Sequence, residues 1–377
     1  MPIRVAVPHE TTPGERRVAL NPVVAEQLSR LGVQVQIQAG AGCAAYYRDR
    51  DYTTAEIVED RTALLSQADI VLTVSPLVPE DVALLREGTL VIGFLHPHEF
   101  DDRIRALRDG KITGFAMELV PRISRAQNMD ALSSQASIAG YKAALRAASQ
   151  TARFFPMLTT AAGTIRPAKV LVIGVGVAGL QAIATAKRLG ASVEAYDVRP
   201  ETREQVESLG ARFVDVKVNA VGEGGYAREL SDEEKQQEME ILAQHVAEAD
   251  AIISTAAVPG RPAPKIITSA MVDKMKPGAV IIDLAAHSGG NCELTIPGES
   301  FGHELVMVYG PLNVPAMMPV HASEMYARNL FNFLSLIVHD GELSPDWDDE
   351  VVAGSVLTRD GKIQHELTRE RIEGGQS

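Results

Sequence analysis

The sequence predicts an α/β fold of two Rossmann-like, doubly wound domains with parallel sheets, joined by two long helices. Its 377 residues are too many for one ordinary hydrophobic core. Apolar strand-like segments alternate with amphipathic helical ones, and the middle of the chain contains a glycine-rich turn between a strand and a helix. We expect the first domain at 1–135 plus 320–377 and the second at 136–319.

The first third of the chain has the alternation that is typical of a parallel sheet with helical crossovers. The expected strands are 3–7, 33–38, 70–74, 90–95 and 112–116, and the expected helices are 23–31 and 99–108. Pro8 and His9 follow the first strand, where a nucleotide-binding domain would have glycines that let pyrophosphate approach backbone amides. We therefore expect this half to be Rossmann-like without a nucleotide of its own.

Apolar residues that recur every three or four positions predict two longer helices, over 134–155 and 321–338. The first would carry the chain into the second domain, and the second would return it to the first. Between them we expect strands at 192–197, 250–255 and 280–284 and a helix at 201–209. The second domain therefore occupies the middle of the chain.

Composition excludes several classes of protein. A formal net charge of −13 argues against nucleic acid as a partner, since such binding depends on clustered Lys and Arg. The two cysteines, Cys43 and Cys292, lack metal-ligand spacing and indicate neither a disulfide framework nor a metal site, which favours a reducing cytosol. No secretory signal is apparent, and the longest apolar run, 170–180, is shorter than the roughly 20 residues of a spanning helix, so we expect no direct membrane insertion.

A dinucleotide fingerprint of the form G-x-G-x-x-G follows the apolar segment 169–173 and opens a predicted helix. Glycines in this pattern give a tight turn, a close approach of backbone to pyrophosphate and close packing of helix on strand. The pattern alone is weak, but the preceding strand, the following helix and an acidic residue 23 positions after Gly174 strengthen it. The expected cofactor-binding residues are Gly174, Gly176, Val177, Ala178, Gly179, Asp197 and Arg199.

Asp197 ends the next predicted strand, where a carboxylate accepts hydrogen bonds from the adenosine ribose and repels a 2′-phosphate. This favours NAD(H) over NADP(H). Arg199, two residues later, leaves the alternative open, because an arginine there can instead meet a 2′-phosphate.

The polar loop 121–134 gathers Arg122, Gln127, Asp130 and Ser133 between two apolar segments. One interpretation is a loop that holds a ligand. The other is a solvated connection in which Asp130 or Ser133 only caps the following helix.

Three further residues have two interpretations each. His96 and His98 follow a predicted strand, where a catalytic acid can lie, although histidines on a loop are more often structural or exposed. Tyr226 lies in the glycine-rich segment 221–226 and either closes over a bound cofactor or is an exposed aromatic on a loop tip.

Four segments together resemble a known family: 4–20 with its Pro-Gly-Glu-Arg-Arg-Val-Ala-Leu core, the loop 122–134, the glycine turn 174–181 and the segment 282–292. They are similar to the NAD(H)-binding alpha subunits of proton-translocating NAD(P) transhydrogenases, over nearly the whole chain. The resemblance implies that Arg122 and Asp130 orient the nicotinamide carboxamide and ribose and that Ser133 supports them. It also implies that Gln127 reaches toward the second nucleotide and that Tyr226 belongs to a loop that closes on NAD(H).

The same resemblance implies direct hydride transfer between NADH and NADP⁺, with NAD(H) bound here and NADP(H) on a partner subunit. It implies NADP(H)-binding and membrane-spanning subunits as partners, a homodimer, and a cytoplasmic position, peripheral on the cytoplasmic face of the inner membrane. The family couples hydride transfer to proton translocation.

Alanine dehydrogenases share this architecture and are the alternative. Arg17 and His96 match the arginine and histidine of that enzyme's site, but Thr73 stands at the position of its lysine and His287 at that of its aspartate. Loss of the cation that would polarise a keto acid argues against amino-acid oxidation. A non-catalytic NAD-sensing module is the third hypothesis.

Overall fold

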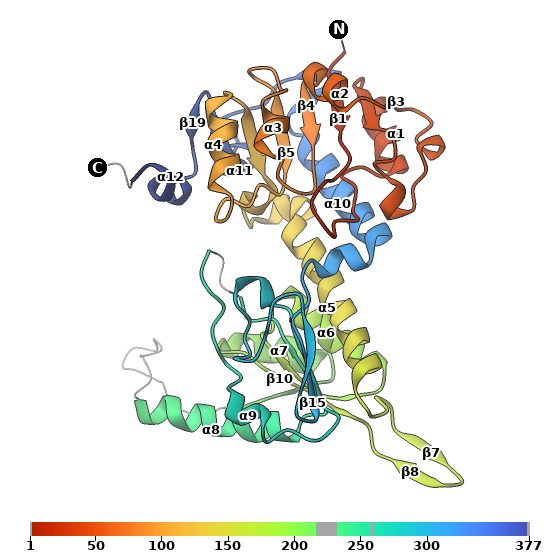
Figure 1. The fold of residues 1–377 in the computed structure, drawn as a ribbon, viewed down its shortest axis with the longest axis vertical. Helices are drawn as coiled ribbons and strands as arrows, with labels where there is room; N and C mark the ends of the chain where they lie inside the picture. The colour runs from red at the N-terminus through yellow and green to blue at the C-terminus, as the bar shows by residue number, and fades with distance from the viewer. Residues whose placement is uncertain (1, 216–231, 258–259, 375–377) are drawn as a thin grey trace. The chain divides into compact units, whose positions relative to one another are not determined.

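The computed structural model describes residues 2–215, 232–257 and 260–374. The chain divides into two compact units, one formed by Met1–Gln135 with Pro315–Ser377 and one by Ala136–Val314 (Figure 1). The first passage between units lies within helix α5 (Ala131–Gln150). The second lies in the 3-10 turn η7 (Val314–Met317), so helix α10 (Pro319–Leu334) belongs wholly to the first unit.

An eight-stranded sheet forms the centre of the first unit, in the order β19-β18-β6-β5-β4-β1-β2-β3. Its strands are β1 (Arg4–Val7), β2 (Gln34–Gln38), β3 (Glu56–Val58), β4 (Ile70–Leu72), β5 (Leu90–Gly93), β6 (Thr113–Ala116), β18 (Val356–Arg359) and β19 (Lys362–Ile363). The first six are parallel, and β18 and β19 add an antiparallel edge. Chain order reverses between β1 and β4, which is the topological switch point where doubly wound sheets bind ligands.

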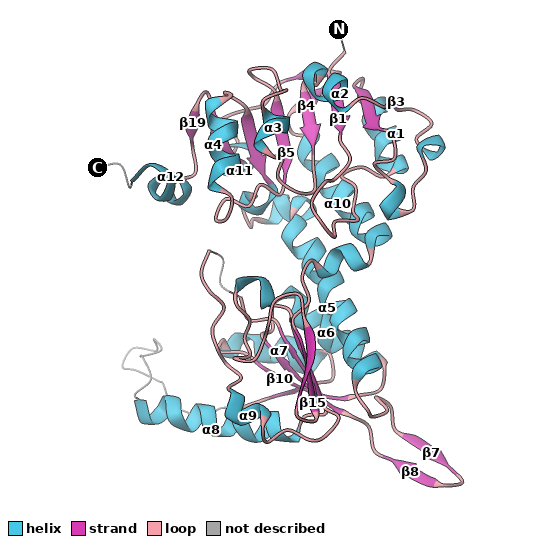
Figure 2. Cartoon of the chain, viewed as in Figure 1, coloured by secondary structure: helices cyan, strands magenta, loops and turns pink. Residues whose placement is uncertain are grey.

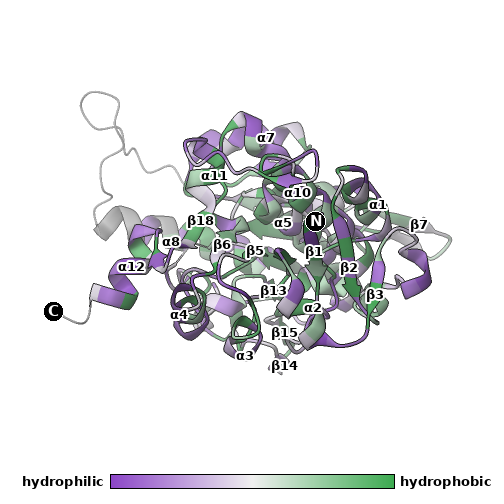
Figure 3. Cartoon of the chain, turned by 90° about the horizontal axis from the view of Figure 1, so that it is seen from above, coloured by the Kyte–Doolittle hydropathy of each residue, from purple (hydrophilic) through white to green (hydrophobic). Residues whose placement is uncertain are grey.

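Helices cover this sheet on both faces, as the cyan helices beside the magenta strands show (Figure 2). The helices are α1 (Pro22–Arg30), α2 (Arg61–Gln67), α3 (Pro79–Val82), α4 (Asp101–Asp109), α11 (Glu350–Ser355) and α12 (Glu366–Glu373), together with α10. A small antiparallel pair, β16 (Val338–His339) and β17 (Glu342–Leu343), follows α10. The strands β5 and β6 are hydrophobic, whereas α4 also carries hydrophilic residues (Figure 3).

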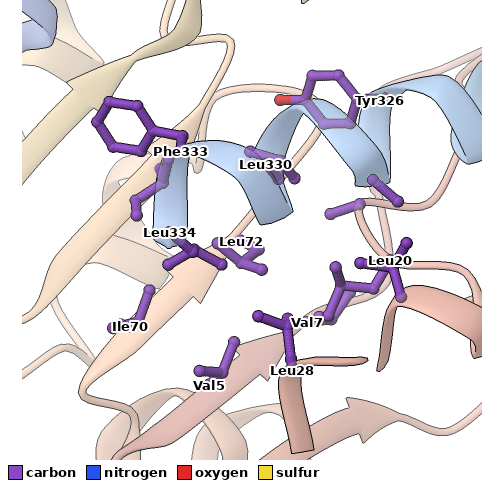
Figure 4. Packing of buried hydrophobic residues seen from close by; sticks show 14 of the residues in the cluster. Val5, Val7, Leu20, Leu28, Ile70, Leu72, Tyr326, Leu330, Phe333 and Leu334 are labelled. Carbon is purple, nitrogen blue, oxygen red and sulfur yellow. The ribbon is translucent and has the colours of Figure 1, made fainter. Parts of the chain in front are cut away.

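Helix α10 packs one apolar face on the first sheet. Its residues Leu330, Phe333 and Leu334 are fully buried and lie over Val5 of β1 and Leu72 of β4 (Figure 4). Burial of a large apolar side chain contributes about 1.5–3 kcal/mol. Residues from the C-terminal part of the chain therefore supply core for a domain that begins at the N-terminus.

The second unit contains a seven-stranded sheet in the order β11-β10-β9-β12-β13-β15-β14, parallel except for β14. Its strands are β9 (Lys169–Ile173), β10 (Ser192–Tyr196), β11 (Arg212–Phe213), β12 (Ala251–Ser254), β13 (Val280–Asp283), β14 (Ser300–His303) and β15 (Val306–Tyr309). Its helices, apart from the later part of α5, are α6 (Val177–Arg188), α7 (Arg203–Ser208), α8 (Asp232–Glu248) and α9 (Ser269–Val272). Chain order reverses between β9 and β12, so the glycine turn after β9 lies at this unit's switch point.

A hairpin of β7 (Leu158–Thr160) and β8 (Gly163–Ile165) extends away from the second sheet (Figure 1). All six residues of its strands are exposed. Met157 and Ile165 are 65% and 46% exposed, respectively, so the hairpin presents apolar side chains to its surroundings.

Helix α5 ends at Gln150, five residues before the predicted end at Phe155. The chain leaves the helix because the amide of Ala152 donates to the carbonyl of Gly278, 3.2 Å away, instead of continuing the helical pattern. Phe155 is buried in the second core from a non-helical segment. Among the helices of the described ranges, none is both long and apolar enough for a bilayer crossing.

Candidate functional site

The turn between β9 and α6 needs glycine at two positions because neighbouring atoms leave no room. Gly174 has a left-handed backbone with φ of 89°, and a Cβ there would lie 2.7 Å from Thr255 Oγ1. A Cβ on Gly179 would overlap the Gly174 carbonyl. Gly176 differs, since a Cβ there would meet no heavy atom within 4 Å. The open space beside Gly176 fits a phosphate that approaches the backbone closely.

Helix α6 begins directly after Gly176 and aims its N-terminus at this space. The amides of its first turn, at Val177, Ala178 and Gly179, have no partners within the helix, and the helix dipole places positive charge there. Gly140 allows α5 to approach α6 closely, because a Cβ at that position would overlap the Ala178 carbonyl. The turn is therefore suited to the pyrophosphate of a dinucleotide.

Asp197 follows β10, and its carboxylate is 6% exposed. One oxygen accepts the amide of Val175 at 2.7 Å, and the other accepts the amide of Arg199 at 2.9 Å. The Arg199 guanidinium donates to both oxygens at 3.0 Å. Burial alone would raise the pKa of Asp197, but these donors outweigh burial and hold the pKa below its ordinary value. A carboxylate thus lies beside the glycine turn, already paired with the arginine that favoured the NADP(H) interpretation.

The loop 122–133 of the first unit is anchored at several of its residues. Its 3-10 segment η4 (Ser124–Met129) buries Ala126 and Met129. The carbonyl of Asn128 accepts the side-chain amides of Asn329 and Asn332 on α10, at 2.8 and 2.9 Å. The loop's backbone is thereby held to the first core.

Arg125 reinforces this anchor through a bidentate ion pair with Asp349, at 2.9 and 3.0 Å. Asp349 also caps α11 by accepting the amides of Val351 and Val352. The Arg125 guanidinium and these amides lower the pKa of Asp349.

Arg122 and Gln127 are the exceptions in the anchored loop. Both are exposed, and neither side chain makes a hydrogen bond or ion pair with any residue in the part of the chain that the structure describes. Asp130 accepts the amide of Ser133 at 2.8 Å and its hydroxyl at 2.6 Å. Asp130 therefore caps α5, as one interpretation of the sequence predicted, while Arg122 and Gln127 remain available to a ligand.

Arg17, which matches the arginine of an alanine dehydrogenase site, is engaged within the first unit. Its guanidinium forms a bidentate pair with Glu15, at 2.8 and 2.7 Å, and donates to Gln135 Oε1 at 2.9 Å. The Glu15 side chain is 1% exposed. Thr73 is buried in the same unit, and His287 is exposed on the second unit.

Other ionisable groups lie at the carboxyl ends of the first sheet's strands. Burial raises the pKa of Glu10 to about 7, although its oxygens accept the amides of Val74 and Ser75. Burial likewise raises the pKa of Glu118, which accepts the amide of His96 at 2.8 Å. Burial alone would lower the pKa of His96, but Glu99 and Glu118 outweigh it and raise the pKa.

Of the predicted site residues, the structure brings Asp130 and Ser133 together on the first unit. On the second unit it places the glycine turn beside Asp197 and Arg199. Tyr226 lies outside the described residues. Across the described ranges, no group of three or more His, Cys, Asp or Glu is arranged to hold a metal ion.

Sequence reasoning missed the buried polar residues behind the glycine turn. Asp283 and Asn291 are fully buried, and Asn291 bonds to the backbone of Ala256, next to Thr255. Both residues lie in the segment 282–292 that carries the family resemblance, but its Gly289-Gly290-Asn291 sequence marks only a tight turn and does not identify the distant partner of Asn291.

A doubly wound sheet with a glycine turn at its switch point and a carboxylate after the next strand defines a dinucleotide-binding protein. The chain belongs to the alanine dehydrogenase/PNT family: the model of that family's N-terminal domain matches residues 6–139, and the model of its C-terminal domain matches residues 143–366. The predicted fold class and family resemblance are therefore confirmed.

Similarity within the family is greater to transhydrogenases. The chain is 47% identical over 376 residues to the first part of the NAD(P) transhydrogenase subunit alpha of Rhodospirillum rubrum, covering 96% of this chain and 98% of that one. The crystal structure of transhydrogenase from Sinorhizobium meliloti matches with a TM-score of 0.87 at 41% identity, covering 96% of this chain and 99% of the other. An L-alanine dehydrogenase structure matches with a TM-score of 0.83 at 25% identity over 100% of both chains. The first relative is thus named as a subunit of an NAD(P) transhydrogenase, the second as a transhydrogenase and the third as an alanine dehydrogenase.

Proposed function

We propose that this chain is the NAD(H)-binding component of a proton-translocating transhydrogenase. In this proposal, bound NADH supplies a hydride directly to NADP⁺ on a separate NADP(H)-binding subunit, and the transfer is coupled to proton translocation. The observation that carries the proposal is the loop 122–133, whose backbone is anchored to α10 while Arg122 and Gln127 have free, exposed side chains. Such a loop offers polar groups to a ligand without having to be ordered first.

Each group of residues has its own role in the proposed binding. The turn at Gly176 and the first amides of α6 would hold the pyrophosphate, and Asp197 would accept the adenosine ribose hydroxyls. Arg122 and Asp130 would orient the nicotinamide carboxamide and ribose, with Ser133 holding Asp130 in place.

Gln127 would contact the second nucleotide, and Tyr226, outside the described residues, would close on NAD(H). No general base is needed in this scheme. Orientation of the reacting groups can lower a barrier by roughly 7–11 kcal/mol.

The partners in this proposal are an NADP(H)-binding subunit and a membrane-spanning subunit, which would hold the chain at the cytoplasmic face of the inner membrane. A homodimer is also proposed, and the β7–β8 hairpin supports it. An isolated two-stranded hairpin is marginal in water, and this one exposes Met157 and Ile165. Pairing with a second copy would bury these side chains.

The hairpin proposal is tested by changing both Met157 and Ile165 to aspartate and measuring mass by sedimentation equilibrium. We expect a dimeric wild type and a monomeric double variant, since two buried unpaired charges are costly. Exchange of exposed Leu367 on α12 for aspartate serves as the control and should leave the mass unchanged. A wild type that sediments as a monomer would contradict the homodimer.

The principal experiment mixes the chain with a purified NADP(H)-binding transhydrogenase subunit and follows hydride exchange between the bound nucleotides. Exchange is expected with the wild type. Gln127→Asn, which shortens the side chain by one methylene, should slow exchange more than it weakens NADH binding. Asn128→Gln is the matched control, because Asn128 contacts α10 through its backbone carbonyl and its exposed side chain has no proposed role.

Two alternative functions predict different results. An alanine dehydrogenase would oxidise NADH with pyruvate and ammonia in the absence of any partner, which the pairing of Arg17 with Glu15 disfavours. A non-catalytic NAD-sensing module would bind NADH and transfer no hydride to any acceptor. Absence of exchange with a competent partner would reject the transhydrogenase proposal.

A further inference from the structure

We propose that Asn291 is a positioning residue for the dinucleotide-binding turn, acting through the backbone of Ala256, against which Gly174 packs. This inference rests on the proposed binding of NAD(H) at that turn. It concerns only the second unit, in which every contact that carries it lies.

The Asn291 side chain is fully buried and uses both ends of its amide on one segment of backbone. Its Oδ1 accepts the amide of Ala256 at 3.0 Å, and its Nδ2 donates to the carbonyl of Ala256 at 2.7 Å. The same Nδ2 donates to the carbonyl of Pro264 at 3.0 Å. The Asn291 side chain therefore holds the backbone at Ala256 and at Pro264, both of which follow β12 in the chain.

Ala256 and its neighbour Thr255 form the wall beside the glycine turn. The amide of Thr255 donates to the carbonyl of Ile173 at 2.8 Å, and its Oγ1 donates to the carbonyl of Gly174 at 2.9 Å. A Cβ on Gly174 would lie 2.9 Å from the amide nitrogen of Ala256. A shift of the Ala256 backbone would thus move the atoms that define where Gly174 lies.

Asp283, at the end of β13, holds the backbone directly after Asn291. The buried Asp283 carboxylate accepts the amide of Cys292 at 3.0 Å and the hydroxyl of Thr295 at 2.6 Å. It also accepts the Ser254 hydroxyl at 3.0 Å, which joins it to the end of β12. The polar connection therefore runs from β13 through Asn291 and the loop after β12 to the carbonyl of Gly174.

The two possible roles of this connection predict different results. If Asn291 only stabilises the unit, its loss lowers the melting temperature but leaves the folded protein with an unchanged affinity for nucleotides. If it positions the turn, ligands that contain the pyrophosphate lose affinity, whereas AMP, which lacks the pyrophosphate, loses less.

The test is Asn291→Ala, with dissociation constants measured by calorimetry for NADH, ADP-ribose and AMP, and melting temperature measured in parallel. We expect NADH and ADP-ribose to bind about tenfold more weakly, equivalent to about 1.4 kcal/mol, with a smaller change for AMP. The matched control is Thr358→Val in the first unit, a buried hydroxyl that links the Gly114 amide to the Ile112 carbonyl. It should lower the melting temperature and leave all three dissociation constants unchanged.

Thr255→Val supplies a second variant that keeps side-chain shape and removes only the hydrogen bond to Gly174. If Asn291→Ala does not fold, Thr255→Val tests the same polar connection at its other end. It should also weaken the binding of NADH and ADP-ribose more than the binding of AMP. Unchanged dissociation constants in the folded variants would overturn the inference. A wild type that binds NADH but never exchanges hydride with a competent partner would instead reject the proposed function and leave this inference standing.

Discussion

Replacing Asp197 by asparagine tests the preference for NADH over NADPH. The carboxylate is nearly buried, accepts the amide of Val175, and holds the Arg199 guanidinium on both oxygens. Asparagine keeps the size and one acceptor but removes the charge. Arg199, whose side chain is 53% exposed, then loses its charged partner and becomes available to a 2′-phosphate.

The expected change has two components. A hydrogen bond to a charged group contributes about 1.5–3 kcal/mol and one to a neutral group about 0.5–1.5 kcal/mol, so NADH should lose about 1–1.5 kcal/mol. For NADPH, the Asp197 carboxylate and the 2′-phosphate, taken as two unit charges about 5 Å apart, repel by about 3 kcal/mol at an effective dielectric constant of 20. Arg199 already offsets roughly half of this repulsion in the wild type. Together these give a change of about 3 kcal/mol, or about a hundredfold, in the ratio of the two dissociation constants.

Fluorescence titration of the reduced nucleotides measures this ratio directly. Asp215→Asn is the control, because Asp215 is an exposed carboxylate of the same unit, paired with Arg203 rather than placed at the turn. It changes the net charge equally and should leave the ratio unaltered. An unaltered ratio for Asp197→Asn would refute the assignment of Asp197 to the ribose.

Three further substitutions follow from the structure. Gly176→Ala should leave the melting temperature near that of the wild type, because the added methyl meets open space, but it should weaken NADH binding. Gly179→Ala should destabilise the protein by about 1–3 kcal/mol, because its methyl would overlap the Gly174 carbonyl. Equal melting temperatures for the two variants would contradict this prediction. Glu10 keeps its proton in the native state up to about pH 7 but loses it near pH 4.5 when unfolded, so its contribution to stability falls as pH rises from 4.5 to 7. Glu10→Gln should flatten that part of the pH dependence in thermal unfolding, and an unchanged slope would show that Glu10 is ionised throughout.

Much of the fold was predictable because central strands of parallel sheets are buried on both faces. Segments such as Val280–Asp283 and Leu90–Gly93 begin with three consecutive buried apolar residues, and their ends were placed within a few residues. The β7–β8 hairpin was missed because its three-residue strands are wholly exposed and carry no burial pattern. Phe155 extended the predicted helix because an apolar residue buried from a loop has the same spacing as one on a helix.

The site was predictable where its chemistry is local in sequence. The glycine turn and Asp197 lie within 23 residues of one another and follow a known spacing. The Asn291 connection was missed because its partner Ala256 lies 35 positions away, and only the fold brings them together. In the loop 122–133, the sequence likewise could not show which residues are anchored and which side chains are free. The anchoring depends on α10, whose Asn329 is 201 residues from Asn128.

The discontinuity of the first unit has a consequence for the order in which the protein is assembled during translation. Residues 136–314 form a compact unit from one uninterrupted stretch, so this unit is synthesised while the first still lacks Pro315–Ser377. Those residues include Leu330 and Phe333, which fill the first core, so the N-terminal strands remain partly open on the ribosome until that part of the chain has been synthesised. A released chain truncated after residue 314 would therefore hold a complete nucleotide-binding unit behind an N-terminal segment still accessible to chaperones and proteases.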